Sequence, residues 1–334
     1  MTTSLSHLTT LRVGGTPRSL TVVTNETEII EAVRTADFEQ RPIFILGGGS
    51  NIIVADDFAG DVIKIESRGI DNDSTACAGA WVTVQAGQPW DEFVSHAVSN
   101  GWVGVEALSG IPGTVGATPI QNVGAYGQQV SDTIAQVRAW NRETNEVDTL
   151  FVGGCDFGYR SSLFKSNPGK WVVLSIVFQL KLGDLSTPIA YPELAAHVGT
   201  EVGLRASLVE VRDAVLALRR NKGMVVDPSD PDTWSVGSFF LNPRSELVPE
   251  GAPSWEQPDG LHKISAAWLI EQAGFGKGFG LNDRATVSTK HTLALTNRGD
   301  ASAADVLELA QHIRAGVQNK FGIVLDMEPQ IIRS

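Results

Sequence analysis

Residues 110–126 carry the sequence feature that most restricts how this chain can fold. The segment reads GIPGTVGATPIQNVGAY, and its glycines at positions 110, 113, 116 and 124 follow neither a helical nor a strand period. A helix or strand with this many glycines would lose stability, because glycine gives up more backbone entropy on folding than any other residue. The segment is typical of a backbone shaped around a ligand, and a purely structural loop is the alternative.

A second glycine-rich motif lies earlier, at Gly47-Gly48-Gly49-Ser50-Asn51. It follows the apolar run at residues 42–46, which predicts a buried strand that ends in a tight loop. Backbone N–H groups without side chains around them can approach a phosphate, although an ordinary tight turn would have the same sequence. Neither motif matches the dinucleotide-binding pattern Gly-x-Gly-x-x-Gly, and the chain has no P-loop and no Gly-x-Ser-x-Gly nucleophile motif.

The charge balance excludes broad classes of partner. The 334 residues include 26 Lys and Arg against 38 Asp and Glu, a net charge of -12. This argues against a nucleic-acid or anionic-membrane surface but permits an anionic small ligand, which needs only a few local cations. The longest apolar stretch, residues 172–180, is too short to cross a bilayer, and no secretory leader is visible, so we expect a cytoplasmic protein. Cys77 and Cys155 offer neither a zinc site nor a disulfide framework.

The length of 334 residues predicts two or three domains, and strand signals that dominate from residue 76 to about residue 182 predict an α+β middle domain. Residues 26–36 read as a helix capped by Asn25, with Glu28 completing a capping-box-like pattern. Two further segments, 208–218 after a cap-like Ser207 and 303–321, repeat apolar residues at helical spacing. The proline- and aspartate-rich residues 223–235 predict a surface loop. Strands are predicted at residues 80–84, 136–140, 147–151, 172–180 and 323–325.

Three further motifs complete a pattern that resembles a known family. They are Gly158-Tyr159-Arg160-Ser161-Ser162-Leu163-Phe164, Gly237-Ser238-Phe239-Phe240-Leu241-Asn242-Pro243 and Met327-Glu328-Pro329. With the two glycine-rich segments, and at matching separations over nearly the whole chain, they resemble the UDP-N-acetylenolpyruvoylglucosamine reductases, the MurB family. The resemblance implies an α+β fold in which a two-subdomain FAD-binding module of the vanillyl-alcohol-oxidase (PCMH) type precedes a C-terminal α/β substrate-binding domain. The implied divisions are residues 1–70 and 71–215 for the two FAD-binding subdomains, 216–322 for the substrate-binding domain and 323–334 for a segment that returns to the active site.

The resemblance implies that both glycine-rich segments bind FAD and that NADPH supplies the hydride. Residues 47–51 would approach the pyrophosphate, and residues 110–126 would line the cofactor. The implied FAD-binding residues are Gly47, Gly48, Gly49, Ser50, Asn51, Ile111, Gly113, Thr114, Val115, Gly116, Ala117, Ile120, Asn122, Gly124, Ala125 and Tyr126. No metal ion is expected.

The implied catalytic residues are Arg160, Ser238 and Glu328. Adding hydride to an enol ether builds negative charge, which the permanently charged guanidinium of Arg160 can stabilise by two-point binding to the substrate carboxylate. Ser238 would protonate the carbanion-like carbon, which a serine can do only with help from its neighbours. Glu328 would polarise or protonate the enolate. We expect it to be protonated or held in a proton network, because an ionised carboxylate would repel the intermediate. Without the resemblance, Arg160 could equally form a surface ion pair and Ser238 could belong to a turn.

The resemblance also implies a set of substrate-binding residues. The lysines would meet diphosphate oxygens, and Tyr191 would belong to a loop that folds over the nucleotide, with a core tyrosine as the alternative reading. The set is Tyr126, Tyr159, Arg160, Tyr191, Lys222, Ser238, Asn242, Lys277 and His291. Leu241 departs from the family branch that has lysine beside the Asn-Pro pair, which puts any electrostatic role of that side chain in doubt.

The resulting hypothesis is a monomeric reductase that converts UDP-N-acetylenolpyruvoylglucosamine to UDP-N-acetylmuramic acid for peptidoglycan synthesis. NADPH would reduce FAD and leave before the sugar nucleotide enters the same cleft. Neither a nucleic-acid nor a membrane partner is expected. Two alternatives stay open. An FAD oxidase of the same superfamily would react steadily with oxygen, and a non-catalytic nucleotide-sugar-binding protein would hold no flavin.

Overall fold

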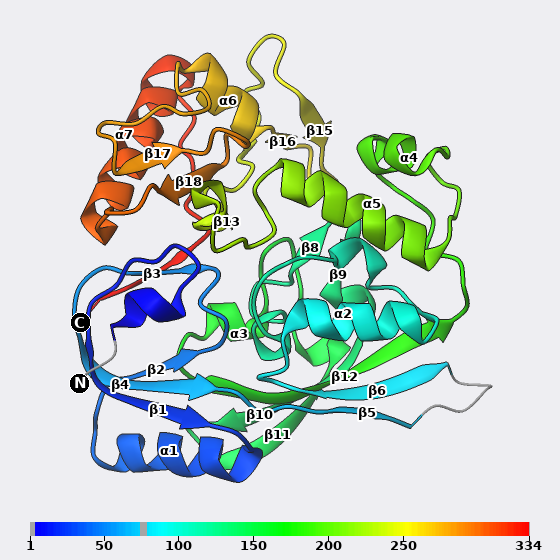
Figure 1. Cartoon of the computed structure of the whole chain (residues 1–334), viewed down its shortest axis with the longest axis vertical. Helices are drawn as coiled ribbons and strands as arrows, with labels where there is room; N and C mark the ends of the chain where they lie inside the picture. Colours follow the sequence, from blue (N-terminus) through cyan, green and yellow to red (C-terminus); the bar gives the residue numbers. More distant parts are fainter. Residues whose placement is uncertain (1–3, 74–78, 334) are drawn as a thin grey trace. The chain divides into compact units, whose positions relative to one another are not determined.

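The computed structural model describes residues 4–73 and 79–333, which form two compact units (Figure 1). The sheet unit comprises residues 18–48 and 59–220, and the terminal unit comprises the residues up to 17, residues 49–58 and the residues from 221 onward. The sequence did not indicate that residues 49–58 belong with the C-terminal part of the chain. The domain borders expected at residues 70, 215 and 322 stay predictions.

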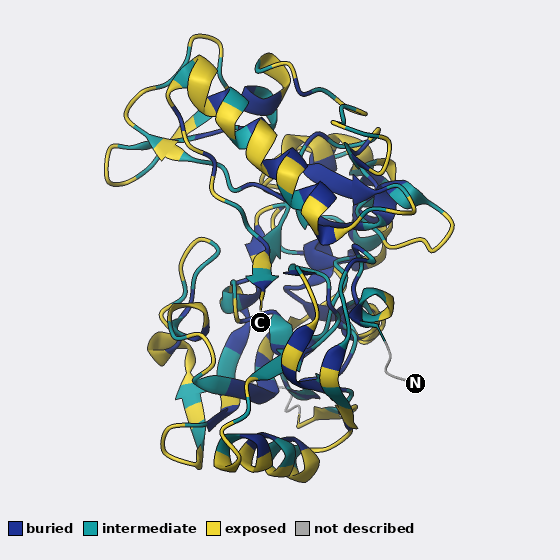
Figure 2. Ribbon diagram, turned by 90° about the vertical axis from the view of Figure 1, so that its left-hand side faces the viewer, coloured by how far each residue is buried: buried dark blue, intermediate teal, exposed yellow. Residues whose placement is uncertain are grey.

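The smaller sheet of the sheet unit has three strands and one helix. Its order is β1 (Pro17–Val23), β4 (Phe58–Ile65) and β2 (Ile43–Leu46), with β2 parallel to β4. Helix α1 (Glu26–Phe38) runs below this sheet in Figure 1, and it buries Ile29 and Val33 while its opposite face is exposed (Figure 2). The strand predicted at residues 42–46 and the helix predicted at residues 26–36 are therefore confirmed.

The cap of α1 differs from its prediction in one contact. Asn25 Oδ1 accepts the N–H of Glu28 at 3.0 Å, as the cap requires. The Glu28 carboxylate, however, accepts the N–H of Thr24 at 2.7 Å and the Thr24 hydroxyl at 2.9 Å. The Glu28 side chain therefore bonds Thr24, the residue before the cap, and not the N–H of Asn25 that a capping box would use.

The larger sheet is antiparallel. The strands predicted at residues 80–84, 136–140, 147–151 and 172–180 are all confirmed in it. A short strand, β7 (Trp102–Val103), pairs with β12 outside the main order. The main order is β11 (Glu146–Phe151), β10 (Ile134–Asn141), β12 (Trp171–Leu182), β6 (Ala80–Gln85) and β5 (Ile70–Asn72).

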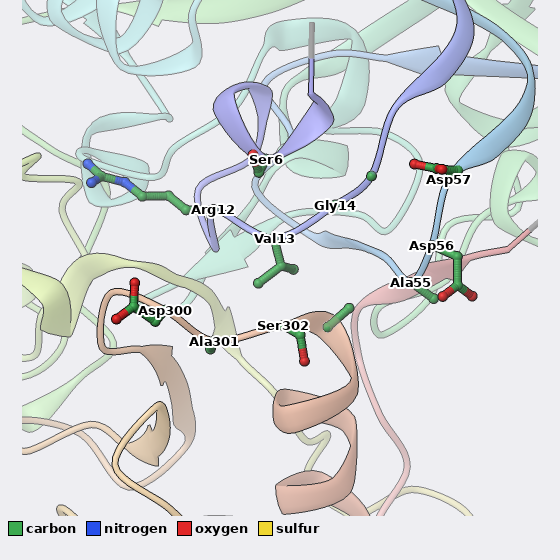
Figure 3. Close-up of a pocket in the computed structure, with 12 residues that line it drawn as sticks. Ser6, Arg12, Val13, Gly14, Ala55, Asp56, Asp57, Asp300, Ala301 and Ser302 are labelled. Carbon is green, nitrogen blue, oxygen red and sulfur yellow. The ribbon is translucent and has the colours of Figure 1, made fainter. Parts of the chain in front are cut away.

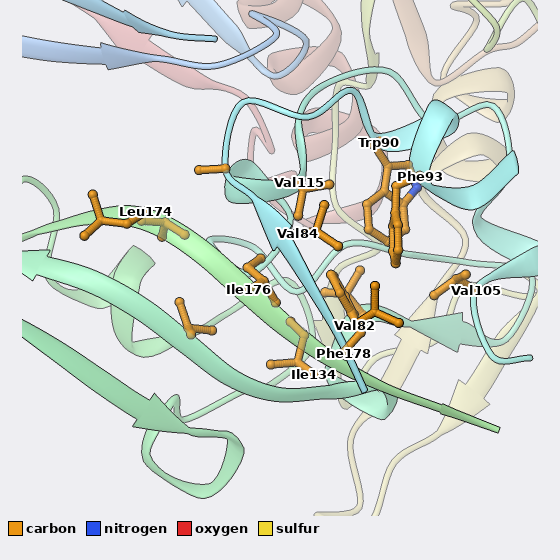
Figure 4. Close-up of a cluster of buried hydrophobic side chains, with 14 of the residues drawn as sticks. Val82, Val84, Trp90, Phe93, Val105, Val115, Ile134, Leu174, Ile176 and Phe178 are labelled. Carbon is orange, nitrogen blue, oxygen red and sulfur yellow. The ribbon is translucent and has the colours of Figure 1, made fainter. Parts of the chain in front are cut away.

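Helix α2 (Trp90–Ser99) closes the core of the sheet unit against this sheet (Figure 4). Phe93 stacks on Phe178 of β12 with ring centroids 4.8 Å apart, and Trp90 packs edge-on against Phe93. Full burial of each such side chain is worth about 1.5 to 3 kcal/mol. Cys155 is also buried, and desolvation raises the pKa of its thiol to about 11, while Cys77 lies outside the described residues.

The rest of the sheet unit is built from short elements. Helix α5 (Leu208–Asn221) confirms the helix predicted at residues 208–218 and packs against α4 (Pro192–Val198) in a small apolar cluster. The remaining elements are α3 (Leu163–Ser166), the hairpin of β8 (Gly124–Ala125) and β9 (Gln128–Gln129), and the 3₁₀ helices η2 (Glu106–Leu108), η3 (Val115–Ala117), η4 (Val130–Asp132) and η5 (Val152–Gly154).

The terminal unit packs two helices, α6 (Ala266–Gln272) and α7 (Ala303–Phe321), against small sheets. The apolar face of α7, which includes Val306, Ile313 and Val317, is fully buried, and the helix predicted at residues 303–321 is confirmed. The sheets are β13 (Ser235–Ser238), β18 (Ala294–Asn297) and β17 (Ala285–Val287); β14 (Arg244–Ser245), β16 (His262–Ile264) and β15 (Ser254–Glu256); and β19 (Gln330–Ile332) parallel to β3 (Ile52–Val54). The 3₁₀ helices η1 (Leu5–Leu8) and η6 (Pro231–Thr233) complete the unit.

Two predictions for the terminal unit need correction. The strand expected at residues 323–325 is wrong. Ile323 and Leu325 are buried in the core, but their backbone joins no ladder, and the strand lies further on, at β19. The loop at residues 223–235 is exposed only in part, since Asp232 is buried and its carboxylate accepts the Ser288 and Thr289 hydroxyls.

We predict that Asp305→Asn lowers the stability of the terminal unit. The carboxylate accepts the N–H and hydroxyl of the α7 cap, Ser302, and binds Arg284. The bond from Arg284, followed by the bonds from Ser302, holds the pKa of Asp305 well below its usual range. A carboxyl whose pKa is depressed by folding stabilises the folded state at pH values above the ordinary carboxyl pKa. This contribution is lost as the pH falls toward the depressed pKa. The loss should be about 1 to 2 kcal/mol at pH 7, the range for a lost helix cap.

Urea unfolding at pH 7 and at pH 3 measures this effect, and the gap between wild type and Asp305→Asn should narrow at the lower pH. Asp300→Asn is the matched control, because Asp300 is exposed and also acts electrostatically on Arg284. Equal stability of Asp305→Asn and wild type at pH 7 would contradict the assignment.

Candidate active site

The two glycine-rich segments meet inside the sheet unit. A Cβ atom on Gly48 would lie 2.5 Å from the Cα of Gly113, and one on Gly47 would lie 2.5 Å from Oγ1 of Thr114. Separations this short do not occur for real Cβ atoms, so glycine at position 48 allows the two backbones to lie this close, while at position 47 the neighbour is the Thr114 side chain. Segments far apart in the sequence therefore pack directly against each other, and all four of these residues remain partly accessible.

The turn at residues 113–117 is held by hydrogen bonds to the segment that follows β6. The N–H of Val115 donates to the carbonyl of Gln88 at 2.8 Å, and that of Gly116 donates to the carbonyl of Ala86 at 2.8 Å. A Cβ on Gly116 would lie 2.6 Å from the Cβ of Ala86. These two N–H groups serve the fold, so any contact of Val115 and Gly116 with the cofactor has to use other atoms.

Arg160 is fixed against the second half of the glycine-rich segment. Its guanidinium donates to the carbonyl of Asn122 at 3.2 Å and to that of Gly124 at 2.8 Å, and its backbone has a left-handed φ of 52°. The Asn122 side chain donates back to the carbonyl of Gly158 at 3.1 Å, and the Ser162 hydroxyl donates to the carbonyl of Ile120 at 2.6 Å. The motif at residues 158–164 is thus hydrogen-bonded to the glycine-rich segment at residues 110–126.

Three predicted tyrosines lie in the same unit. Tyr126 has a left-handed φ of 49°, and its ring meets that of Tyr191 edge-on with centroids 6.0 Å apart. Burial raises the pKa of Tyr126, so its hydroxyl stays protonated well above neutral pH. Tyr159 and Tyr191 are half exposed, and the Arg160 guanidinium lies 5.7 Å from the centroid of the Tyr159 ring.

The terminal unit brings Ser238 and Glu328 together. Ser238 ends β13 opposite Ala294 of β18, immediately after Gly237, whose φ is 77°. The N–H of Glu328 donates to the carbonyl of Phe239 at 2.9 Å, so the two predicted catalytic residues stand on neighbouring stretches of backbone. Both are partly accessible.

The end of the first glycine-rich motif, residues 49–51, lies beside the segment that carries Glu328. The carbonyl of Asn51 accepts the N–H of Gln330 at 3.1 Å, where β3 pairs with β19. Gly49 adopts a φ of 61°, and a Cβ there would lie 2.1 Å from the carbonyl oxygen of Leu8, so glycine is required. Residues 49–51, including Ser50, are therefore neighbours of the Glu328 segment.

The predicted substrate-binding residues of the terminal unit are less concentrated. The Asn242 side chain oxygen accepts the N–H of Ala266 at the start of α6, which fixes the orientation of its amide. Lys222 directly follows α5 and is partly buried, whereas Lys277 is exposed in the loop after α6. His291 lies in the turn before β18, where its N–H donates to the Ser288 hydroxyl.

A partly buried ionic cluster was missed by the sequence reasoning. Asp91 accepts two hydrogen bonds from Arg212, at 2.7 and 2.9 Å, and one from the N–H of Gly110 at 2.6 Å. Arg219 lies behind them, and burial lowers its pKa to about 10, which still leaves it charged at neutral pH. The available signal was the pair of arginines two turns apart on a helix whose face is otherwise apolar. Their partner on α2 is distant in the sequence.

A cavity of the terminal unit does not coincide with these residues. It has a volume of about 720 Å³ beside the start of α7, and Arg12, Asp56, Asp57 and Asp300 line it (Figure 3). None of the predicted site residues belongs to its lining. Across residues 4–73 and 79–333, no cluster of three or more His, Cys, Asp or Glu side chains suited to a metal ion is found. No helix in the same ranges is long and apolar enough to span a membrane.

Comparisons with known proteins agree with the motif pattern. Residues 17–149 match the model of an FAD binding domain, and residues 228–332 match that of the UDP-N-acetylenolpyruvoylglucosamine reductase C-terminal domain. The UDP-N-acetylenolpyruvoylglucosamine reductase of Cutibacterium acnes is 50% identical over 98% of this chain and 89% of its own length. The Thermobifida fusca enzyme of the same name is 48% identical over 98% of this chain and 96% of its own.

A solved structure extends the likeness to the fold. The UDP-N-acetylenolpyruvylglucosamine reductase (MurB) of Thermus caldophilus superposes with a TM-score of 0.69 at 25% identity, covering 100% of this chain and 98% of that one. The α+β class, with an FAD-binding module followed by a C-terminal domain, is thereby confirmed. The chain belongs to the UDP-N-acetylenolpyruvoylglucosamine reductase family and is an FAD-dependent oxidoreductase.

Proposed function

We propose that this chain reduces UDP-N-acetylenolpyruvoylglucosamine to UDP-N-acetylmuramic acid with NADPH as hydride donor, in the cytoplasmic phase of peptidoglycan synthesis. Through the cell wall, this step would serve cell shape and division. The observation that carries the proposal is the hydrogen bond from Glu328 N–H to the Phe239 carbonyl, which joins the segments of the two proposed proton donors, Ser238 and Glu328. Family membership names the substrate, and this arrangement supplies a chemical reason for it.

The glycine packing in the sheet unit fits FAD. A dinucleotide with a pyrophosphate needs main chain without side chains around it, and the close approach of Gly47 and Gly48 to residues 113–114 provides such main chain. The proposed cofactor contacts extend from there along the segment that ends at Tyr126. When bound, FAD would accept hydride from NADPH and deliver it to the enolpyruvyl double bond.

Arg160 is proposed to stabilise the negative charge that develops on the substrate. Its guanidinium plane is held by the carbonyls of Asn122 and Gly124, so the cation is oriented before substrate arrives. A preorganised charge needs no reorganisation when the anion forms, and a planar guanidinium matches a carboxylate in two-point geometry. Lysine, a flexible point charge, would lose both advantages.

Ser238 and Glu328 are proposed to deliver the proton that completes the reduction. The serine hydroxyl would protonate the carbon, and Glu328, protonated or held in a proton network, would polarise the enolate. The ladder between β13 and β18 shifts register between Ser235 and Ser238, next to the left-handed Gly237, and such irregularities are common beside active sites, where they can re-aim a side chain.

The remaining proposed contacts bind the sugar nucleotide. Lys222 and Lys277 would meet diphosphate oxygens, and the edge-on ring pair of Tyr126 and Tyr191 would contact the nucleotide. Tyr159, Asn242 and His291 complete the set. A monomeric state and the absence of nucleic-acid and membrane partners remain predictions.

The decisive experiment is the visible absorption spectrum of the purified protein under anaerobic conditions. Flavin bands should bleach on addition of NADPH and return when UDP-N-acetylenolpyruvoylglucosamine is added. If the bands return only when oxygen is added, the protein is an FAD oxidase and not the proposed reductase. A colourless protein that cannot be reconstituted with FAD would favour the alternative of a non-catalytic nucleotide-sugar-binding protein.

Gly48→Ala should lower the flavin content, because the new methyl group would collide with the backbone of Gly113. Overpacking of this kind costs about 1 to 3 kcal/mol, which corresponds to a loss of FAD affinity of roughly fivefold to 150-fold if the loop moves aside. Gly154→Ala is the matched control, since a Cβ there meets nothing within 4 Å. The ratio of flavin absorbance to protein measures the effect, and equal ratios in the two variants would refute it.

Glu328→Gln and Ser238→Ala should each lower kcat by about a hundredfold or more, the usual range for a lost proton donor. Bleaching by NADPH should keep its wild-type rate, because the proton is needed only after hydride reaches the sugar nucleotide. Asp326→Asn, an exposed carboxyl on the same segment, is the control and should leave kcat unchanged. Turnover of Glu328→Gln within twofold of wild type would remove this residue from the mechanism.

A further inference from the structure

Residues 184–207, here called the Tyr191 segment, are hydrogen-bonded mainly to themselves. The N–H of Ser186 donates to the carbonyl of Ala206 at 2.8 Å, and that of Ile189 donates to the carbonyl of Leu204 at 2.9 Å. The N–H of Gly203 returns to the carbonyl of Ile189 at 2.8 Å. The segment, which carries α4 and Tyr191, therefore closes as a loop of its own, and other contacts must fasten it to the sheet unit.

Thr187 supplies polar contacts of that kind. Its N–H donates to Oε1 of Glu106 at 2.7 Å, and its hydroxyl donates to the same oxygen at 3.2 Å. The amide of Gln128 donates to the Thr187 hydroxyl at 2.7 Å. Thr187 therefore joins the Tyr191 segment to two residues in the rest of the sheet unit, Glu106 and Gln128.

Glu106 and Gln128 are themselves rigidly held. Glu106 is completely buried, and its second oxygen accepts the N–H of Gly104 at 2.7 Å. Gln128 is 9% exposed, and its side-chain oxygen accepts the N–H of Ala107 at 2.8 Å. Buried polar groups are costly to leave unpaired, so this arrangement is disrupted if Thr187 moves away.

The same attachment sets the position of the two tyrosines. Gln128 follows Tyr126 by two residues, and a Cβ on the intervening Gly127 would lie 2.6 Å from the Cβ of Ala190. Ala190 precedes Tyr191, whose ring meets that of Tyr126 edge-on. Gly127, next to Tyr126, therefore packs against the methyl group of Ala190, next to Tyr191.

Apolar packing alone holds this region weakly. The cluster beneath the segment is small, with Ile189, Leu194 and Ala195 against helix α5, and it is separate from the main core of the unit. A cavity of about 20 Å³ lies next to Glu106, Gln128 and Thr187. Regions with few buried apolar contacts open locally more easily than a core does, so a few hydrogen bonds can decide their position.

We propose that Glu106, Gln128 and Thr187 form a latch that holds the Tyr191 segment against Tyr126 and so positions Tyr191 for the sugar nucleotide. The three would be positioning residues that act through the tyrosine, and none of them is among the proposed substrate or cofactor contacts. The proposal rests on the proposed function, because that function assigns Tyr126 and Tyr191 to the substrate.

Thr187→Val tests the latch with a side chain of nearly the same shape. It removes the hydroxyl that bonds Glu106 and Gln128, and the loss of these partly buried hydrogen bonds should raise amide hydrogen exchange in residues 184–207 by about tenfold. Thr187→Ser restores a hydroxyl and should exchange like wild type. Thr200→Val, the same change within the segment but outside the latch, is the matched control. Wild-type exchange in Thr187→Val would overturn the latch, whether or not the enzyme has the proposed activity.

Kinetics test the positioning role. Thr187→Val should raise KM for UDP-N-acetylenolpyruvoylglucosamine by about tenfold, with flavin content and KM for NADPH unchanged and with wild-type values in Thr187→Ser. Faster exchange with an unchanged KM would overturn the positioning role. A wild-type protein without this turnover would refute the proposed function instead, and the exchange measurement would still decide the latch.

Discussion

Direct contact between two stretches of main chain, at residues 47–48 and 113–114, is the constraint on which the rest of the sheet unit depends. A single added methyl group at Gly48 would separate them. The second stretch is in turn bonded to the segment after β6 through Val115 and Gly116, and β6 lies within the larger sheet. The two glycine-rich segments are thereby built on a rigid support, which offsets the flexibility that glycine would otherwise bring.

The elements that could be predicted from sequence are those whose signal is local. Helix α7 has an apolar stripe and a Ser302 cap, and the predicted bounds agree with the structure. The strands of the larger sheet were equally clear, because β-branched and aromatic side chains favour a pleated surface wherever it lies. In contrast, Ile323 and Leu325 alternate like strand residues, yet they fill a core without joining a ladder.

The candidate site could be predicted from sequence only through whole-family resemblance. Nothing near Glu328 says that its N–H bonds the carbonyl beside Ser238, because that contact depends on how distant segments pack. The salt bridge between Asp91 and Arg212 was missed for the same reason, since each residue alone reads as an ordinary helix-surface charge. The local sequence pattern identifies helices and strands, but the contacts that bring the candidate site residues together form between elements that are distant in the sequence.

The pairing of β3 with β19 also has a consequence for the order in which the protein is made. Residues 52–54 leave the ribosome early, but their partner, residues 330–332, is synthesised after every other described element. The sheet unit is complete once residue 220 has emerged, so it can fold during translation while the terminal unit still lacks a strand. The nascent chain therefore holds β3 unpaired for most of its synthesis, and the segment that carries Glu328 takes its position last.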